Sequence, residues 1–285
     1  MASSRFTVSG TPGDPSLTFF GGMGRWVGEL RRNSGLIHTL FWRRYVHRFE
    51  GSVLGIVWVV VMPCVPLVVY TTLQYMGIFN ASSENLPRAV FTGWGILFFF
   101  VFADTLRLTS GMLILHRREI LQTGIPKMVL LVVAAFQALV DLLMRSAALG
   151  VTMALMGIRP DWWIFLAPVF AMALAALGFS IGCVLSLVAV YYRDLLNLIV
   201  AFLSYLFYAS AVFITFNPKQ HVGFIFGLLR WQPTYMIIDG GRQLCLLDKI
   251  DHPVALAVTV LICFACVPFG VTLFYRGESL VNSHL

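Results

Sequence analysis

Long apolar runs alternate with short polar segments along most of this chain, beginning at Val53. A run of about 18 apolar residues or more is long enough for a helix to cross a bilayer core of about 30 Å. The pattern therefore predicts an all-α, polytopic membrane protein with six transmembrane helices. Their predicted ranges are 53–76, 89–115, 128–156, 163–190, 198–216 and 253–275. Pro63 and Pro66 are expected to kink the first of them.

The segment before the first span has a different pattern. Residues 1–20 are rich in Ser, Thr, Gly and Pro and predict a flexible tail. In residues 21–52, apolar side chains recur at close to helical spacing between arginines, which predicts an amphipathic helix at the cytoplasmic membrane interface. The alternative is an ordinary charged juxtamembrane segment. The apolar positions are Trp26, Leu30, Ile37, Phe41 and Tyr45.

Residues 217–252, between the last two spans, contain two apolar pieces, "HVGFIFGLL" and "TYMIIDGGRQLCLL". Both are too short to cross a bilayer, and short apolar pieces between full spans are typical of re-entrant or interfacial helices. We expect a re-entrant helical hairpin that enters from the outside and acts as a gate. Residues 53–276 would form one transmembrane domain, and residues 277–285 a cytoplasmic tail.

The distribution of Lys and Arg predicts the orientation, because cytoplasmic loops carry an excess of these residues. With the N-terminus inside, the inner segments hold twelve and the outer segments six, which favours cytoplasmic N- and C-termini. The inner set is Arg5, Arg25, Arg31, Arg32, Arg43, Arg44, Arg48, Arg117, Arg118, Lys127, Arg193 and Arg276. The outer set is Arg88, Arg159, Lys219, Arg230, Arg242 and Lys249.

Composition excludes a soluble domain, since 12% of the residues are charged and 59% are hydrophobic, against about 25% charged in a typical soluble protein. The net charge of +7 is accounted for by the membrane-side asymmetry, so no nucleic-acid partner is expected. Cys263 and Cys266 form a C-x-x-C inside an apolar helix, and no second pair or His cluster completes a zinc site. We therefore expect no metal site.

Two Asp/Arg combinations lie within the predicted spans. Asp141 and Arg145 are four residues apart, and Asp104 and Arg107 are three apart. Charges at such depths normally face a bundle interior or a watery cavity. They could border a translocation path, or they could be self-neutralised structural pairs, with Arg107 reaching the inner surface.

Aromatic residues make up 14% of the chain. Sugar rings stack well on aromatic side chains, so a wide channel with aromatic walls could pass a glycan, although Phe is also common on lipid-facing surfaces. Our channel-lining candidates are Trp94, Phe98, Phe99, Tyr205, Tyr208, Asp141 and Arg145.

Several catalytic motifs are missing from the sequence. It contains no G-x-x-x-x-G-K-[ST], G-x-S-x-G or H-E-x-x-H, and its six His are dispersed. We therefore expect a protein that is not an enzyme, has no catalytic residues or cofactor of its own, and relies on a separate subunit for any ATP hydrolysis.

Three motifs occur in a fixed order along the chain. The first is "RFEGSVLGIVWVVVMP", with Gly51, Ser52, Leu54, Gly55, Trp58 and Pro63. The second is "YRD", formed by Tyr192, Arg193 and Asp194, and the third has Pro233, Ile237, Ile238 and Arg242. Over about residues 25–280 this order resembles the permease subunit of ABC-2 type polysaccharide and O-antigen exporters. Phe49-Glu50 and "RWQP" depart from the family pattern, which leaves the subfamily and its glycan open.

The resemblance implies a pore formed by a homodimer in the bacterial cytoplasmic (inner) membrane, among membrane lipids. Two copies of an ATPase subunit, which bind ATP and Mg, would drive export of an undecaprenyl-linked polysaccharide such as O-antigen, capsule or teichoic acid. By position, the segments that dock on the ATPase are residues 25–48 and 116–127, and Tyr235 belongs to the outer gate. Candidates for ATPase docking or for lipid phosphate are Arg43, Arg44, Arg48, Arg117, Arg118 and Glu119.

The spacing of Gly51 and Gly55 also predicts a small-xxx-small helix face where the chain enters the bilayer. Three alternative functions remain open at this point. They are an ABC-2 permease for a drug or lipid, an integral-membrane enzyme acting on lipid-linked sugars, and an ion-coupled flippase.

Overall fold

The computed structural model describes most of the chain from residue 19 onward. The described residues are 19–47, 50, 51, 55, 57, 58, 61, 65, 68, 69, 72, 73, 76, 77, 88–155, 157, 162–212, 231–247 and 250–282. Every regular element among them is a helix, which confirms the all-α prediction. The elements are α1 (Phe19–Arg32), α2 (Ser34–His47), α4 (Arg88–Leu115), α5 (Arg117–Thr123), α6 (Lys127–Leu155), η1 (Trp162–Leu166), α7 (Ala167–Tyr191), α8 (Asp194–Ala209), α10 (Pro233–Leu247) and α11 (Pro253–Asn282).

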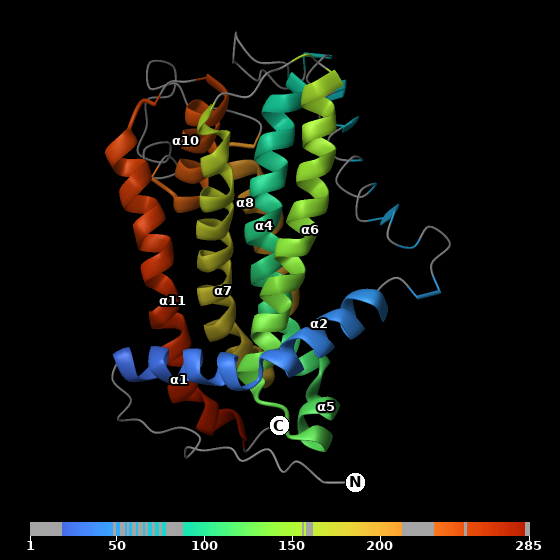
Figure 1. The fold of residues 1–285 in the computed structure, drawn as a ribbon, viewed down its shortest axis with the longest axis vertical. Coiled ribbons are helices and arrows are strands. Elements are labelled where there is room, and N and C mark those ends of the chain that lie inside the picture. Colours follow the sequence, from blue (N-terminus) through green and yellow to red (C-terminus); the bar gives the residue numbers. More distant parts are fainter. Residues whose placement is uncertain are drawn as a thin grey trace.

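Helices α4, α6, α7 and α11 run along the long axis of the molecule (Figure 1). Helix α1 lies across one end of this bundle, where α5 and the last turns of α11 also lie, and α10 lies at the opposite end (Figure 1). The chain therefore has one end formed by α1, α2 and α5, called here the basic end, and one end that carries α10, called here the α10 end.

Four helices are long and apolar enough to cross a membrane: Val90–Leu115, Lys127–Val151, Trp162–Tyr191 and Pro253–Glu278. They coincide with four of the six predicted spans. The first predicted span, 53–76, lies mostly outside the described residues. Helix α8 begins at Asp194 and ends at Ala209, because Ser210 has extended backbone; its 16 residues rise about 24 Å. The six-span count therefore stays a prediction, as does the re-entrant nature of residues 217–252.

Small residues bring the central helices close together. A Cβ at Gly178 of α7 would lie 2.7 Å from the Phe102 carbonyl oxygen of α4, and one at Gly270 of α11 would lie 2.6 Å from the Ser180 carbonyl oxygen of α7. At the second crossing the Ser180 hydroxyl donates a hydrogen bond to the Cys266 carbonyl over 2.5 Å. Such close approach maximises van der Waals contact, the main attraction between helices in lipid.

The amphipathic segment forms two helices that rest on the end of the bundle. Gly22 of α1 crosses α11 so closely that a Cβ there would lie 2.5 Å from the Thr272 hydroxyl oxygen. The Tyr275 hydroxyl of α11 donates to Glu29 of α1 over 2.8 Å. At the other end of the segment, the buried Tyr45 of α2 lies against α6. One side of α1 and α2 is therefore fixed to the long helices, and the other side is exposed.

Gly51 and Gly55 do not form the expected helix face. Their φ angles are +77° and +51°, in the left-handed region that favours glycine. Among the described residues, and apart from chain neighbours, no atom lies within 4 Å of a Cβ built at either position. The expectation was wrong because these glycines serve backbone turns, and the i, i+4 spacing alone did not distinguish a turn from a packed helix.

Candidate docking surface at the basic end

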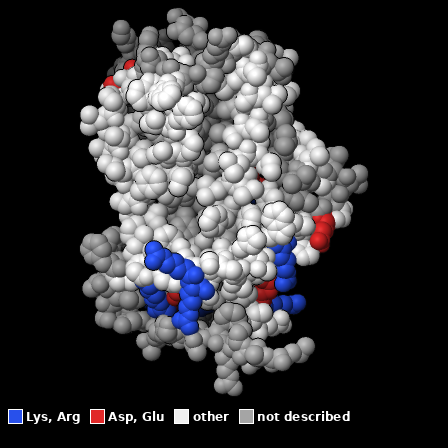
Figure 2. All heavy atoms as spheres, in the orientation of Figure 1, with Lys and Arg blue, Asp and Glu red and all other residues white. Residues whose placement is uncertain are grey.

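Lys and Arg side chains gather at the basic end of the molecule, around α1, α2 and α5, and the face of the bundle seen above them in Figure 2 shows few charged side chains. Arg43 of α2 and Arg117 and Arg118 of α5 are exposed there. Arg48, another of the predicted docking arginines, lies outside the described residues. The exposed arginine candidates therefore lie together on the surface of the basic end.

Helix α5 is a short connector between α4 and α6. Ile120 is buried and anchors it. The helix ends at Gly124, whose φ of +63° is left-handed and whose N–H donates to the Ile120 carbonyl over 3.1 Å. With one face anchored, the opposite face of α5 presents Arg117 and Arg118.

Two of the predicted docking residues bind each other. Arg44 Nη2 of α2 forms an ion pair with Glu119 Oε2 of α5 at 2.5 Å, and the Arg44 side chain is only 10% exposed. Burial alone would raise the pKa of the Glu119 carboxyl, but the hydrogen bond and charge of Arg44, with smaller effects of His116 and Arg43, hold it below its usual value. Arg44 and Glu119 therefore fix α5 against α2 rather than extend toward a partner.

An open groove beside α5 brings Arg193, a residue of the second motif, to this surface. It is lined by Ile114, Leu115, His116, Arg117, Arg118, Glu119, Leu121 and Arg193. Arg193 comes from the turn between α7 and α8, and both it and the neighbouring Asp194 are exposed. The sequence analysis placed Arg193 in a motif but not beside α5, because about 70 residues of intervening chain hide this proximity from any local pattern.

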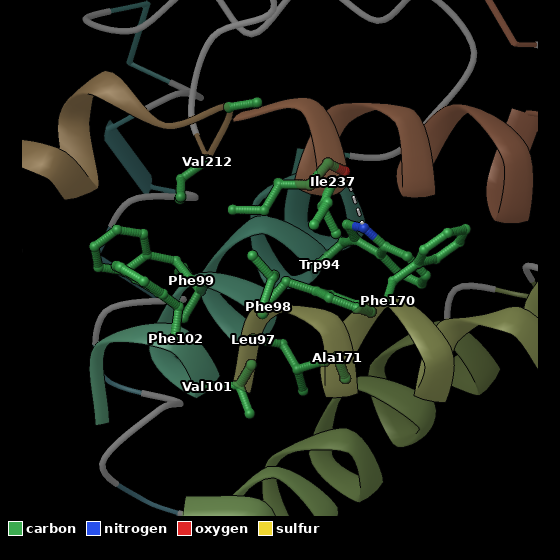
Figure 3. Close-up of a cluster of buried hydrophobic side chains, with 14 of the residues drawn as sticks. Trp94, Leu97, Phe98, Phe99, Val101, Phe102, Phe170, Ala171, Val212 and Ile237 are labelled. Atoms are coloured by element: carbon green, nitrogen blue, oxygen red, sulfur yellow. Dashed lines mark hydrogen bonds between the residues drawn. The ribbon is translucent and has the colours of Figure 1, made fainter. Parts of the chain in front are cut away.

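The aromatic channel candidates divide into two groups. Trp94, Phe98 and Phe99 are at most 2% exposed and lie inside the core, where the Trp94 N–H donates to the Ile238 carbonyl over 3.2 Å (Figure 3). A side chain buried within one subunit cannot line a path between two subunits, so the structure does not support a channel role for these three. Tyr205 and Tyr208 of α8 are 78% and 56% exposed and keep the accessibility that such a role requires.

One of the ion pairs within the spans joins two helices, and the other lies within α4. Arg145 Nη1 of α6 lies 2.7 Å from Asp104 Oδ2 of α4, and Arg107 Nη2 lies 3.5 Å from the other oxygen of the same carboxylate. Asp141 is buried and accepts a hydrogen bond from the Tyr45 hydroxyl of α2 over 3.3 Å. Arg145 thus contacts an acid on the neighbouring helix, which a reading confined to one helix could not show.

The remaining predicted residues lie near the α10 end or in the first span. Pro233 begins α10, and Tyr235 and Arg242 are buried in it. Trp58 is 38% exposed, and Ser52 lies outside the described residues. Among the residues that the structure describes, no group of three or more His, Cys, Asp or Glu could hold a metal ion.

The fold and its basic end define a class, a polytopic helical membrane protein with a positively charged surface at one end. No family model matches the chain. The sequence is similar to the O-antigen export system permease protein RfbA of Myxococcus xanthus, with 26% identity over 197 residues that cover 69% of this chain and 74% of the relative. This similarity confirms the resemblance to ABC-2 type O-antigen permeases that the sequence motifs indicated.

Proposed function

We propose that this chain is the membrane subunit of an ATP-driven exporter that moves a lipid-linked polysaccharide across the bacterial cytoplasmic membrane. Two copies would form the pore, and two copies of a separate ATPase subunit, which bind ATP and Mg, would drive it. The observation that carries this proposal is the similarity to an O-antigen export permease over 69% of the chain, together with four helices able to span a membrane. A membrane enzyme acting on lipid-linked sugars has no comparable support.

The placement of charge supports the orientation. Cytoplasmic loops carry an excess of Lys and Arg, and the exposed arginines of α1, α2 and α5 lie at the end where α11 finishes. We therefore assign the basic end and both termini to the cytoplasm. On this assignment α5 is available to a cytoplasmic ATPase, and the α10 end lies on the outer side.

The anchored position of α5 supports its role as a docking element. Ile120 and the Arg44–Glu119 ion pair hold it against the bundle. A force applied by a partner to Arg117 or Arg118 would therefore reach α2 and α4 directly. A loosely attached loop would lose such a force in local motion.

The docking assignment is tested by charge reversal. Arg118→Glu, alone and with Arg117→Glu, is expected to reduce co-purification with the proposed ATPase subunit at least about tenfold, since like charges across an interface oppose association. Arg276→Glu, which reverses another exposed arginine of the same end, is the matched control and should retain the ATPase. Unchanged co-purification of the double variant would overturn the assignment.

The cargo is tested separately in cells. Deletion of the gene should remove the surface glycan and leave its lipid-linked precursor on the cytoplasmic side, and the wild-type chain should restore export. A deletion that leaves the surface glycan intact, or a glycosyltransferase activity in the purified chain, would contradict the proposal.

A further inference from the structure

Arg242 is a cation with almost no contact with solvent. It lies on α10 and is 1% exposed. Its Nη2 donates a hydrogen bond to the carbonyl of Ala211, just after the end of α8, and its Cζ lies 3.6 Å from the ring centre of Phe91 on α4. One guanidinium group therefore joins three parts of the chain, namely α10, α4 and the end of α8.

This guanidinium is only partly satisfied. The acid found near it is Asp239, with Nη1 and Oδ1 3.8 Å apart, too long for a hydrogen bond. Among the residues that the structure describes, Nε and Nη1 have no hydrogen-bond partner. Burying a charge with unmade hydrogen bonds is costly, and apolar residues of similar volume often fill such positions at no loss of stability. Simple packing therefore does not explain an arginine here.

The opposing surface of α4 is shaped to receive it. A Cβ at Gly95 would lie 3.1 Å from Arg242 Nη2 and 2.6 Å from the Cα of Val212. Only glycine leaves room for both the guanidinium and the segment after α8. Close by, the Trp94 N–H donates to the Ile238 carbonyl of α10 over 3.2 Å (Figure 3). Three residues of α4 thus contact or accommodate α10. The ring of Phe91 packs on the guanidinium, Trp94 donates a hydrogen bond to α10, and Gly95 leaves the space that the guanidinium occupies.

An alternative partner for the Arg242 guanidinium, Asp239, lies on α10 itself. Asp239 is one turn before Arg242, and its Oδ2 accepts a hydrogen bond from the Gln243 amide over 3.0 Å. The same amide contacts Asp251 over 3.1 Å, beyond the end of α10. If α10 moved away from α4, Arg242 would lose Ala211 and Phe91 but could approach Asp239 and water. The free energy lost by burying the Arg242 guanidinium would then be recovered, which lowers the free-energy cost of releasing α10 from α4.

We infer that Arg242 is a positioning residue that clamps α10 against α4 and the end of α8, and that release of this clamp opens the α10 end to the exported molecule. The first half rests on the contacts above. The second half rests on the proposed export function. The clamp differs from a static packing contact in one respect, because its loss should free α10 while the long helices stay assembled.

A native cysteine reports on α10 directly. Cys245, one turn after Arg242, is fully buried, and its thiol contacts the Trp163 carbonyl at 3.2 Å. The full chain, with its other four cysteines replaced by alanine, is placed in lipid nanodiscs, where both faces are accessible, and is labelled with a polyethylene glycol maleimide. Arg242→Gln is expected to raise the labelling rate of Cys245 at least about tenfold, because a charged hydrogen bond that holds α10 is lost.

Two further variants separate the clamp from its parts. Arg242→Lys keeps the charge but cannot present the planar fork to Ala211 and Phe91, so its rate should fall between those of wild type and Arg242→Gln. Phe91→Leu should raise the rate by itself and add little to Arg242→Gln, because both remove the same contact. Arg193→Gln, which removes an exposed arginine near α5, should leave the rate unchanged.

A matched reporter detects general loosening. Cys183 of α7 is also fully buried, and a chain that retains only Cys183 should stay unreactive when Arg242 is replaced by Gln. Equal reactivity of Cys183 and Cys245 would show that Arg242 merely stabilises the bundle, and an unchanged Cys245 rate would show that it does not hold α10. Either result would contradict the proposal that Arg242 holds α10 against α4.

The gating half has its own measurement. Proteoliposomes that contain Arg242→Gln should lose entrapped calcein several times faster than those with wild type, and Arg242→Lys should restore most of the seal. Faster Cys245 labelling without faster calcein loss would mean that α10 is released but closes no path, which overturns this half. If the export function itself were wrong, ATPase co-purification would fail while the Cys245 result still held.

Discussion

The Asp104 carboxylate of α4 lies between two arginines, but it is closer to one of them than to the other. Arg145 is 2.7 Å away and 12% exposed, whereas Arg107 is 3.5 Å away and 54% exposed. In addition, the Arg145 guanidinium lies 5.2 Å from the ring centre of Phe100. A buried charge that loses its partner is strongly destabilising, while an exposed pair contributes little. The Asp104–Arg145 pair therefore fastens α4 to α6, and Arg107 contributes less.

Removing each arginine tests this difference. Arg145→Gln should lower the free energy of unfolding by about 3–5 kcal/mol, because the buried Asp104 loses its 2.7 Å partner and keeps only the longer, exposed contact with Arg107. Arg107→Gln should cost less than about 1 kcal/mol. Thermal unfolding in detergent micelles gives both values. Equal losses in the two variants would contradict the assignment.

His116, at the start of α5, gives the basic end a pH dependence. Burial, followed by the charge of Arg44, lowers the pKa of His116 below its usual value of 6.5, although Glu119 partly offsets this. A histidine with a lowered pKa stays neutral in the folded chain while the unfolded chain takes up a proton. Stability should therefore fall as the pH drops below the unfolded pKa.

The test compares how steeply the unfolding temperature depends on pH in wild type and in a His116 variant. Between about pH 7.5 and about pH 5, the unfolding temperature of wild type should fall more steeply than that of His116→Gln, which lacks this proton uptake. The other five histidines are common to both proteins and cancel in the difference. Parallel curves would show that His116 does not contribute.

At the scale of elements, α1 is held to α11 by one close crossing and one hydrogen bond. Gly22 contacts Thr272, and Glu29 accepts a hydrogen bond from Tyr275. Trp26 adds a ring contact with Phe179 of α7, with 6.2 Å between centroids. Since α11 runs the length of the bundle (Figure 1), a change in the position of α1 acts on a helix that also packs against α10.

A pair of glycine substitutions tests this crossing. Gly22→Ala would place a Cβ 2.5 Å from the Thr272 hydroxyl oxygen, and such overpacking typically costs about 1–3 kcal/mol. Gly24→Ala, two residues on, meets no atom within 4 Å and should be neutral or stabilising by up to about 1 kcal/mol. Hydrogen exchange of the α1 amides should be faster in the first variant only. Similar exchange in both would argue against a tight crossing.

At the scale of the whole molecule, the distribution of charge and the positions of the helices indicate the same orientation across the membrane. The exposed arginines lie at the basic end, and α10 lies at the other end (Figures 1 and 2). The α10–α11 connection near the exposed Asp251 should therefore be outside the cell, and α5 should be inside. The two ends of one bundle must lie on opposite sides of the membrane.

Cysteine labelling in sealed cells tests the orientation. In a chain without other cysteines, Asp251→Cys should react with a membrane-impermeant maleimide, and Arg118→Cys should react only after the cells are permeabilised. Both positions are exposed, so a difference reflects the side of the membrane. Reaction of Arg118→Cys in intact cells would reverse the proposed topology.

Much of the fold could be predicted from the sequence. The ranges predicted for the second, third, fourth and sixth spans lie within α4, α6, η1 with α7, and α11, apart from an overrun of one residue, 156, in the third. Burial in lipid requires unbroken apolar runs, and such runs are local. The end of α8 at Ala209 was not predicted, because the apolar run continues beyond it and only the backbone at Ser210 shows where the helix stops.

The site was predicted only in its broad outline. The sequence by itself determined an all-helical membrane protein with a basic end, because hydropathy and charge act through composition along short stretches. The tertiary structure decided which charges meet. It paired Arg44 with Glu119 and Arg145 with Asp104, buried Trp94 in the core, and placed Arg242 between α10 and α4. Each of these contacts joins residues from different helices, and their distance depends on how the helices pack rather than on any local pattern.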